Sequence, residues 1–120
     1  MTSLQPRQST FCSNVAKLIQ HINSVGMTCT FGDAFRSPVN AEANAKAGIG
    51  IENSLHCLRL AVDLNLFDSD GKYLDKSNDQ YVSIGQYWDS LHDDNRWGGF
   101  FVTRYHGKLA DPNHFEMKDI

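Results

Sequence analysis

The chain has 120 residues, a mass of 13.5 kDa and a formal net charge of -3 at pH 7. A chain of this length supports one hydrophobic core, so we predict a single domain that spans residues 1–120. Hydrophobic residues make up 41% and charged residues 21%, which excludes an intrinsically disordered chain. The acidic balance leaves no excess of basic side chains to neutralise phosphates, so a nucleic acid is not an expected partner.

The cysteines and the apolar segments bear on the compartment. The three cysteines, Cys12, Cys29 and Cys57, form no Cys-x-x-Cys pair, which is typical of reduced thiols in a cytoplasm. The first residues lack the basic and apolar regions of a signal peptide, and no apolar run approaches the roughly 18 residues of a membrane span. We therefore expect synthesis in the cytoplasm without a signal peptide, no membrane insertion and a monomeric protein.

The first half of the chain predicts a helix, a strand and a second helix. Apolar residues at steps of three and four predict an amphipathic helix over residues 11–25, which ends at Gly26. Clustered β-branched and aromatic residues predict a strand over 27–35. A short helix is predicted over 37–47, because a serine N-cap precedes a proline at its first position. A loop over 48–55 follows.

The second half predicts a hairpin, a helix and further short elements. Alternating apolar residues predict a strand over 60–67, and Asp70-Gly71 predicts a turn to a returning strand at 72–74. Helical spacing recurs over 83–91. The remaining predictions are a turn at 96–99, a strand over 100–105 and a polar loop leading into 111–118. This order indicates an α+β fold: a compact single domain with a small antiparallel sheet flanked by helices.

Five polar residues have the chemistry of a hydrolytic zinc site. Such a site needs three nitrogen or oxygen ligands, one open position for water, and a carboxylate that takes the proton of the water. His56, Asp63 and His114 could be the ligands, and Asp111 or Glu116 the base. Asp63 also interrupts an otherwise apolar strand, where burial of an unpaired carboxylate is costly.

Zinc binding at these positions requires a bend in the chain. In one straight strand the Cα atoms of His56 and Asp63 would lie about 23 Å apart, whereas each side chain reaches only about 5 to 6 Å to an ion. A loop that turns into the strand near Leu60 would supply the bend. The alternative is a surface histidine and a strand-end aspartate, with Asp111-Pro-Asn-His114 as a turn closed by an Asx cap.

Two segments together resemble a known family. Ser54-Leu-His56-Cys-Leu-Arg-Leu-Ala-Val-Asp63 resembles the S-x-H-x(6)-D signature of the zinc D-Ala-D-Ala carboxypeptidase and L-alanyl-D-glutamate peptidase family. Asp111-Pro-Asn-His114-Phe-Glu116 resembles the second signature of that family. Phe35-Arg36-Ser37 is similar to its strand-end arginine and Arg96-Trp97-Gly98-Gly99 to its W-G-G turn. The signatures lie within residues 28–117.

The resemblance implies how the centre would be built. His56, Asp63 and His114 would hold zinc in a cleft, and Asp111 would be the general base. A purely structural zinc site needs no spare carboxylate three residues from a ligand, so Asp111 favours an enzyme.

Other matched residues would support the centre. Arg36 would bind the substrate or its developing oxyanion, and Ser54 would support the site beside the first ligand. Glu116 would accept the other ring N–H of a ligating histidine. Trp97 could line the floor of the cleft, or it could belong to a packed turn. The chain departs from the family at Arg59, where many members have glycine.

The implied activity is hydrolysis of peptidoglycan peptides by metal-activated water. The short chain resembles single-domain phage endolysins, which leave the host cytoplasm through a phage-encoded pore. A lytic role favours cleavage of the L-Ala-D-Glu bond of the stem peptide. The alternatives are a D-Ala-D-Ala carboxypeptidase and a non-catalytic module that binds the cell wall and keeps a structural zinc.

Overall fold

Apolar side chains at helical spacing produce two helices. The computed structural model describes residues 3–35, 37, 39, 55–100 and 111–119. Within them α1 comprises Leu4–Ser24 and α3 comprises Gln80–Leu91. Helix α1 begins at Leu4 rather than at Phe11, because its first turns are mostly polar and leave no apolar stripe in the sequence. It ends before Gly26, as predicted, and this glycine has a φ of 85°.

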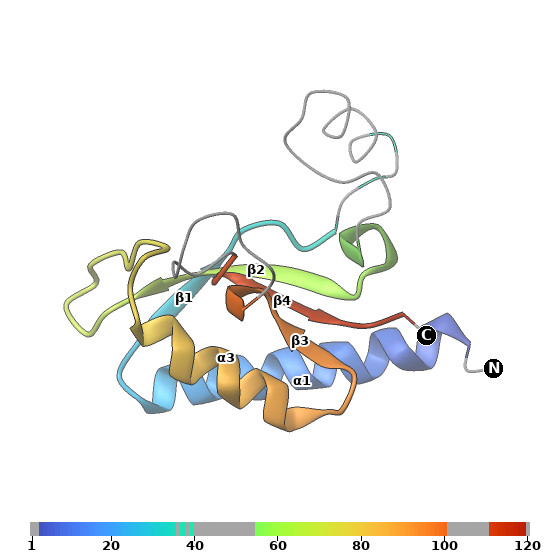
Figure 1. Cartoon of the computed structure of the whole chain (residues 1–120), viewed down its shortest axis with the longest axis horizontal. Coiled ribbons are helices and arrows are strands. Elements are labelled where there is room, and N and C mark those ends of the chain that lie inside the picture. The colour runs from blue at the N-terminus through green and yellow to red at the C-terminus, as the bar shows by residue number, and fades with distance from the viewer. Residues whose placement is uncertain (1–2, 36, 38, 40–54, 101–110, 120) are drawn as a thin grey trace.

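Four short strands form one antiparallel sheet. They are β1 (Thr28–Phe31), β2 (Ala61–Phe67), β3 (Asn95–Trp97) and β4 (His114–Met117), in the order β1-β2-β4-β3. Figure 1 shows α1 and α3 side by side beneath the sheet, so both helices cover the same face. The predicted α+β class is therefore confirmed. The predicted strand over 27–35 is confirmed only over the four residues of β1.

Side-chain alternation along β2 separates a helix-facing side from an open side. Val62, Leu64 and Leu66 are buried in the core, whereas Asp63 and Asn65 between them are only partly buried. The core joins these residues to the apolar faces of both helices, with contributions from Phe11, Leu18, Ile22, Tyr81, Ile84, Trp88 and Phe115. Polar residues of β2 therefore lie on the face that the helices leave open.

Three predicted elements differ from the structure. Arg96 and Trp97 pair with β4 as strand β3, so the predicted turn begins only at Gly98, in the 3-10 helix η2 (Gly98–Phe100). Phe100 ends η2, so it does not begin a strand, and the rest of the predicted strand, 101–105, lies outside the described residues. The predicted helix over 37–47 also lies almost wholly outside them. Residues 114–117, for which no element was predicted, form β4.

The predicted hairpin after β2 is confirmed as a turn. Asp68 accepts hydrogen bonds from the backbone N–H groups of Asp70 and Lys72, and Gly71 has a φ of 79°. The returning strand is reduced to a single bridge between Phe67 and Tyr73. Among the described residues, no helix is both long and apolar enough to cross a membrane.

Gly85 provides a test of this packing. A Cβ atom at Gly85 would lie 1.9 Å from a ring atom of Trp97. In an exposed helix, glycine to alanine adds about 1 kcal/mol of stability. Here we expect Gly85→Ala to lower the free energy of unfolding by about 1–3 kcal/mol, because the indole must move. Urea unfolding measures the change, with the exposed Ser83→Ala in the same helix as the control. Equal stability of Gly85→Ala and wild type would contradict this packing.

Candidate metal centre

The register between β2 and β4 brings two of the predicted ligands together. Asp63 lies directly opposite His114 in the antiparallel pair. Both side chains project from the open face of the sheet, because Val62 and Phe115 occupy the helix-facing side. His114 Nδ1 lies 3.1 Å from Asp63 Oδ1. Two residues that are 51 positions apart in the sequence thus share one site.

A tight turn brings in the third predicted ligand. His56 lies in the 3-10 helix η1 (Leu55–Leu58), which ends where Leu60 N–H donates to the Leu55 carbonyl and Arg59 N–H to the His56 carbonyl. This pair of hydrogen bonds, with Arg59 at a left-handed φ of 56°, is a Schellman turn. It supplies the bend that the spacing requires. His56 Nε2 consequently lies 3.5 Å from Asp63 Oδ1.

The three donor atoms match a zinc site in kind and spacing. One atom each from His56, Asp63 and His114 lies within 4.8 Å of the others. Bonds of about 2.1 Å to a tetrahedral ion place neighbouring ligand atoms about 3.4 Å apart. The separations of 3.1 Å and 3.5 Å from the carboxylate oxygen agree with that value. Two imidazole nitrogens and one carboxylate oxygen also form a ligand set of the catalytic type, with a position left for water.

In each histidine, the outer ring nitrogen, which is the one that does not contact Asp63, lies next to a hydrogen-bond acceptor. His56 Nδ1 lies 3.3 Å from the carbonyl oxygen of Ala34, and His114 Nε2 lies 2.7 Å from Glu116 Oε1. If these outer nitrogens carry the proton, the inner nitrogens present lone pairs toward the carboxylate of Asp63. The position of Glu116 agrees with the contact implied by the resemblance. This arrangement orients both rings for a metal ion.

The charges of the centre are strongly coupled. Burial opposes ionisation of Asp63, but hydrogen bonds to His114 and His56 outweigh it and hold the pKa of this carboxyl well below its usual range. Burial would lower the pKa of His114, but hydrogen bonds to Asp63 and Glu116 raise it to about 9. Burial likewise opposes ionisation of Glu116, and its contact with His114 nevertheless lowers the pKa of Glu116. The carboxylates of Asp63 and Glu116 therefore favour a positive charge on His114, which contacts both of them.

Asp111 lies beside these residues in a half-buried turn. The His114 N–H donates to the Asp111 carbonyl, and the Asp111 N–H donates to the carbonyl of Gly98. The turn touches Gly98 so closely that a Cβ there would lie 2.5 Å from the Asp111 carbonyl oxygen. Burial raises the pKa of the Asp111 carboxyl, opposed by the nearby charge of His114. Lys76 Nζ lies 3.9 Å from Asp111 Oδ1. A carboxyl with a raised pKa is suited to proton transfer.

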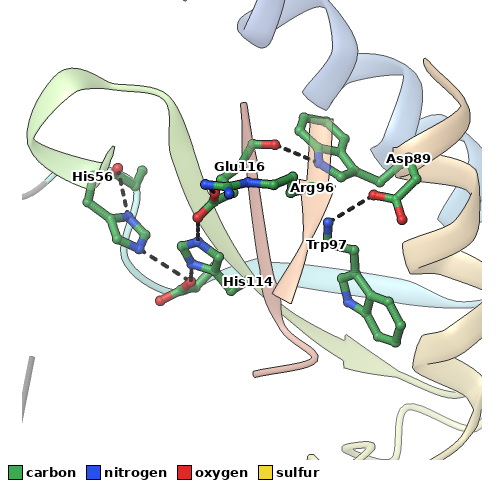
Figure 2. Close-up of polar contacts among 9 residues, drawn as sticks. His56, Asp89, Arg96, Trp97, His114 and Glu116 are labelled. Atoms are coloured by element: carbon green, nitrogen blue, oxygen red, sulfur yellow. Dashed lines mark hydrogen bonds and ion pairs between the residues drawn. The ribbon is translucent and has the colours of Figure 1, made fainter. Parts of the chain in front are cut away.

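Trp97, the last residue of β3, is buried rather than part of an open surface. Its side chain is buried, and its indole N–H donates to the Pro112 carbonyl over 2.6 Å. Its backbone N–H donates to Asp89 Oδ1. Figure 2 shows the indole directed away from His114. Trp97 therefore supports the turn that carries Asp111 from the core side.

Two contacts within the site were not predicted, and two predicted site residues lie outside the described part of the chain. Neither the Ala34 carbonyl nor the contact of Arg96 with Glu116 has a signal in the sequence, because both depend on how distant segments pair. Hydrophobic alternation could have placed Glu116 on the face of His114, since the two are two residues apart in β4. Arg36 and Ser54 lie outside the described residues.

The fold is similar to that of several solved structures. No family model matches the chain, and no curated protein matches it. The crystal structure of the L-Ala D-Glu endopeptidase ChiX from Serratia marcescens is 20% identical, with a TM-score of 0.66 over 88% of this chain and 79% of that chain. The D,D-pentapeptidase VanY of a VanB-type vancomycin resistance cassette, in complex with Zn(II), is 16% identical, with a TM-score of 0.59 over 89% and 70%.

A third solved structure is similar. It is the L,D-carboxypeptidase DacB from Streptococcus pneumoniae, which is 14% identical, with a TM-score of 0.58 over 92% of this chain and 65% of that chain. The fold that the sequence resemblance implied is thus confirmed, since the chain shares it with an endopeptidase, a pentapeptidase and a carboxypeptidase.

The Schellman turn at Arg59 gives a prediction. A left-handed conformation costs a non-glycine residue about 1–2 kcal/mol, whereas the Arg59 guanidinium, 4.1 Å from the centre of the Phe35 ring, returns about 0.5–1 kcal/mol. Arg59→Gly removes both effects and Arg59→Ala removes only the favourable one. We therefore expect the unfolding free energy to decrease in the order glycine, arginine, alanine, with about 1–2 kcal/mol between the extremes. Urea unfolding gives the order, and an alanine variant at least as stable as the glycine variant would contradict it.

Proposed function

We propose that the chain is a zinc-dependent peptidase that cleaves the stem peptide of bacterial peptidoglycan. The observation that carries the proposal is the convergence of His56 Nε2, Asp63 Oδ1 and His114 Nδ1, with Asp111 three residues before His114. The shared fold supports it, because the similar structures are peptidases and one was determined in complex with Zn(II).

His56, Asp63 and His114 would hold the zinc ion. When bound there, zinc would supply Lewis-acid chemistry: it would polarise the scissile carbonyl and lower the pKa of a bound water toward about 7. The ligand histidines remain oriented because the Ala34 carbonyl and Glu116 hold their outer nitrogens. The remaining chemistry belongs to the side chains around them.

Asp111 is the proposed general base. Its carboxylate would accept the proton of the attacking water and then deliver it to the leaving amine as the peptide bond breaks. The half-buried position suits both steps, because burial raises the pKa of this carboxyl and so makes the protonated form accessible. Arg36 is proposed to bind the substrate or the oxyanion that develops on the carbonyl, and Ser54 to support the site near His56.

The bond that is cleaved and the cellular context are proposed from the peptidase family that the sequence resembles. We propose cleavage between L-Ala and D-Glu, in the manner of an endolysin that reaches the cell wall from the host cytoplasm through a phage-encoded pore. The alternative within the same chemistry is a D-Ala-D-Ala carboxypeptidase. A non-catalytic module that binds the cell wall has less support, because the carboxylate of Asp111 lies beside the ligands and remains partly exposed.

The first experiment tests the metal, the activity and the bond together. We expect the purified protein to hold about one zinc ion and to release peptides from purified peptidoglycan, with activity lost in a chelator and restored by added zinc. Mass spectrometry of the products identifies the new termini. New D-Glu amino termini indicate the endopeptidase, and loss of a terminal D-Ala indicates the carboxypeptidase. Full activity after complete zinc removal would overturn the proposal.

A second experiment separates the base from a ligand. Asp111→Asn keeps the size of the side chain but cannot accept the proton, so we expect turnover to fall by about 10²–10⁴-fold with zinc content unchanged. His114→Ala should lose both zinc and turnover. Asp93→Asn, a change at an exposed aspartate of the loop after α3, is the matched control and should match the wild type. Near-normal turnover of Asp111→Asn would move the role of base to another residue.

A further inference from the structure

We propose that Arg96 is a positioning residue of the metal centre and acts through Glu116 on His114. The sequence analysis gave Arg96 no role beyond its place beside Trp97. The inference rests on the proposed function in taking His114 as a zinc ligand. It adds a residue whose side chain points to the centre from β3, the strand on the far side of β4 from Asp63.

The sheet register creates the contact. Arg96 lies directly opposite Glu116 in the β3–β4 pair, and both side chains project from the open face. Arg96 Nη2 donates to Glu116 Oε2, and the other oxygen of the carboxylate, Oε1, lies 2.7 Å from His114 Nε2. Figure 2 shows Glu116 between Arg96 and His114. The carboxylate therefore uses one oxygen for each partner.

Burial makes this contact important for the imidazole. The Glu116 side chain is 8% exposed, whereas that of Arg96 is 50% exposed. A carboxylate that is mostly removed from water needs a partner for each oxygen, and without Arg96 one oxygen would lose a charged donor. We expect the carboxylate then to turn toward solvent and to release the His114 ring. The ring orientation that directs Nδ1 toward Asp63 would be lost with it.

A purely electrostatic role for Arg96 predicts the opposite result. Arginine carries a positive charge, so its removal should strengthen the binding of a divalent cation nearby. Positioning through Glu116 predicts that the same removal weakens binding, by about 10-fold, the lower part of the range found for partners of metal ligands. The sign of the change in zinc affinity therefore distinguishes the two roles.

The test measures the zinc dissociation constant by competition with a chromophoric chelator. The variants are Arg96→Met, which keeps the length without the charge, and Arg96→Lys, which keeps the charge without the planar fork. We expect about 10-fold weaker binding for Arg96→Met and partial recovery for Arg96→Lys. Lys118→Met, which removes one positive charge just beyond β4, is the matched control and should bind zinc as tightly as wild type or slightly more tightly.

Two further measurements keep the outcome clear. Thermal unfolding of the metal-free variants reports any loss of fold, and an unchanged zinc affinity with a lowered melting temperature would assign Arg96 a structural role only. If Arg96→Met does not fold, Arg96→Ala replaces it, because it also removes the positive charge and the donor to Glu116, so the sign of the change in zinc affinity still distinguishes the two roles. Equal or tighter binding by the variant overturns this inference alone. Failure of the wild type to bind zinc overturns the proposed function as well.

Discussion

The antiparallel register between β2 and β4 is the constraint on which the candidate centre depends. It sets Asp63 opposite His114, and the same register sets Val62 opposite Phe115 on the face packed against the helices. Because side chains alternate along a strand, a slip of one residue would move His114 into the core and expose Phe115. Burial of Val62 and Phe115 therefore fixes the positions of two candidate metal ligands that lie on the other face of the sheet. The hydrophobic effect, which has no directionality of its own, here produces a precise polar geometry.

The core also holds the centre through polar groups of the backbone. The indole N–H of Trp97 fixes the Pro112 carbonyl in the turn that carries the proposed base, and Trp88 donates to the carbonyl of Glu116. Both tryptophans are buried, so their N–H groups must find acceptors, and backbone carbonyls next to the site are the acceptors they find. The backbone positions of the residues in the candidate centre are therefore set in part by buried tryptophans of the core.

The features that could be predicted from the sequence are those that depend on residues close together in the chain. The alternation over 60–67 predicted β2 and placed Asp63 on the face away from the core. The motif spacing indicated His56, Asp63 and His114, which the structure brings together. By contrast, β4 has only four residues and β3 only three, so each strand is too short for a periodicity to identify it as a strand. The pairing of Arg96 with Glu116 depends on a register between segments that are 20 residues apart, which no local pattern contains.

The 51-residue separation between Asp63 and His114 also determines when the centre can assemble. In an unfolded chain, bringing these residues and His56 to one ion requires closing long loops, at an entropic cost that nothing yet repays. In the proposed centre, zinc would therefore be a ligand of the finished sheet rather than a template for it, and it would stabilise the native state by mass action. A chain interrupted before residue 111 would lack both the third ligand and Asp111. The proposed peptidase activity would thus require that β4 has joined the sheet, and incomplete or misfolded chains would lack the complete centre.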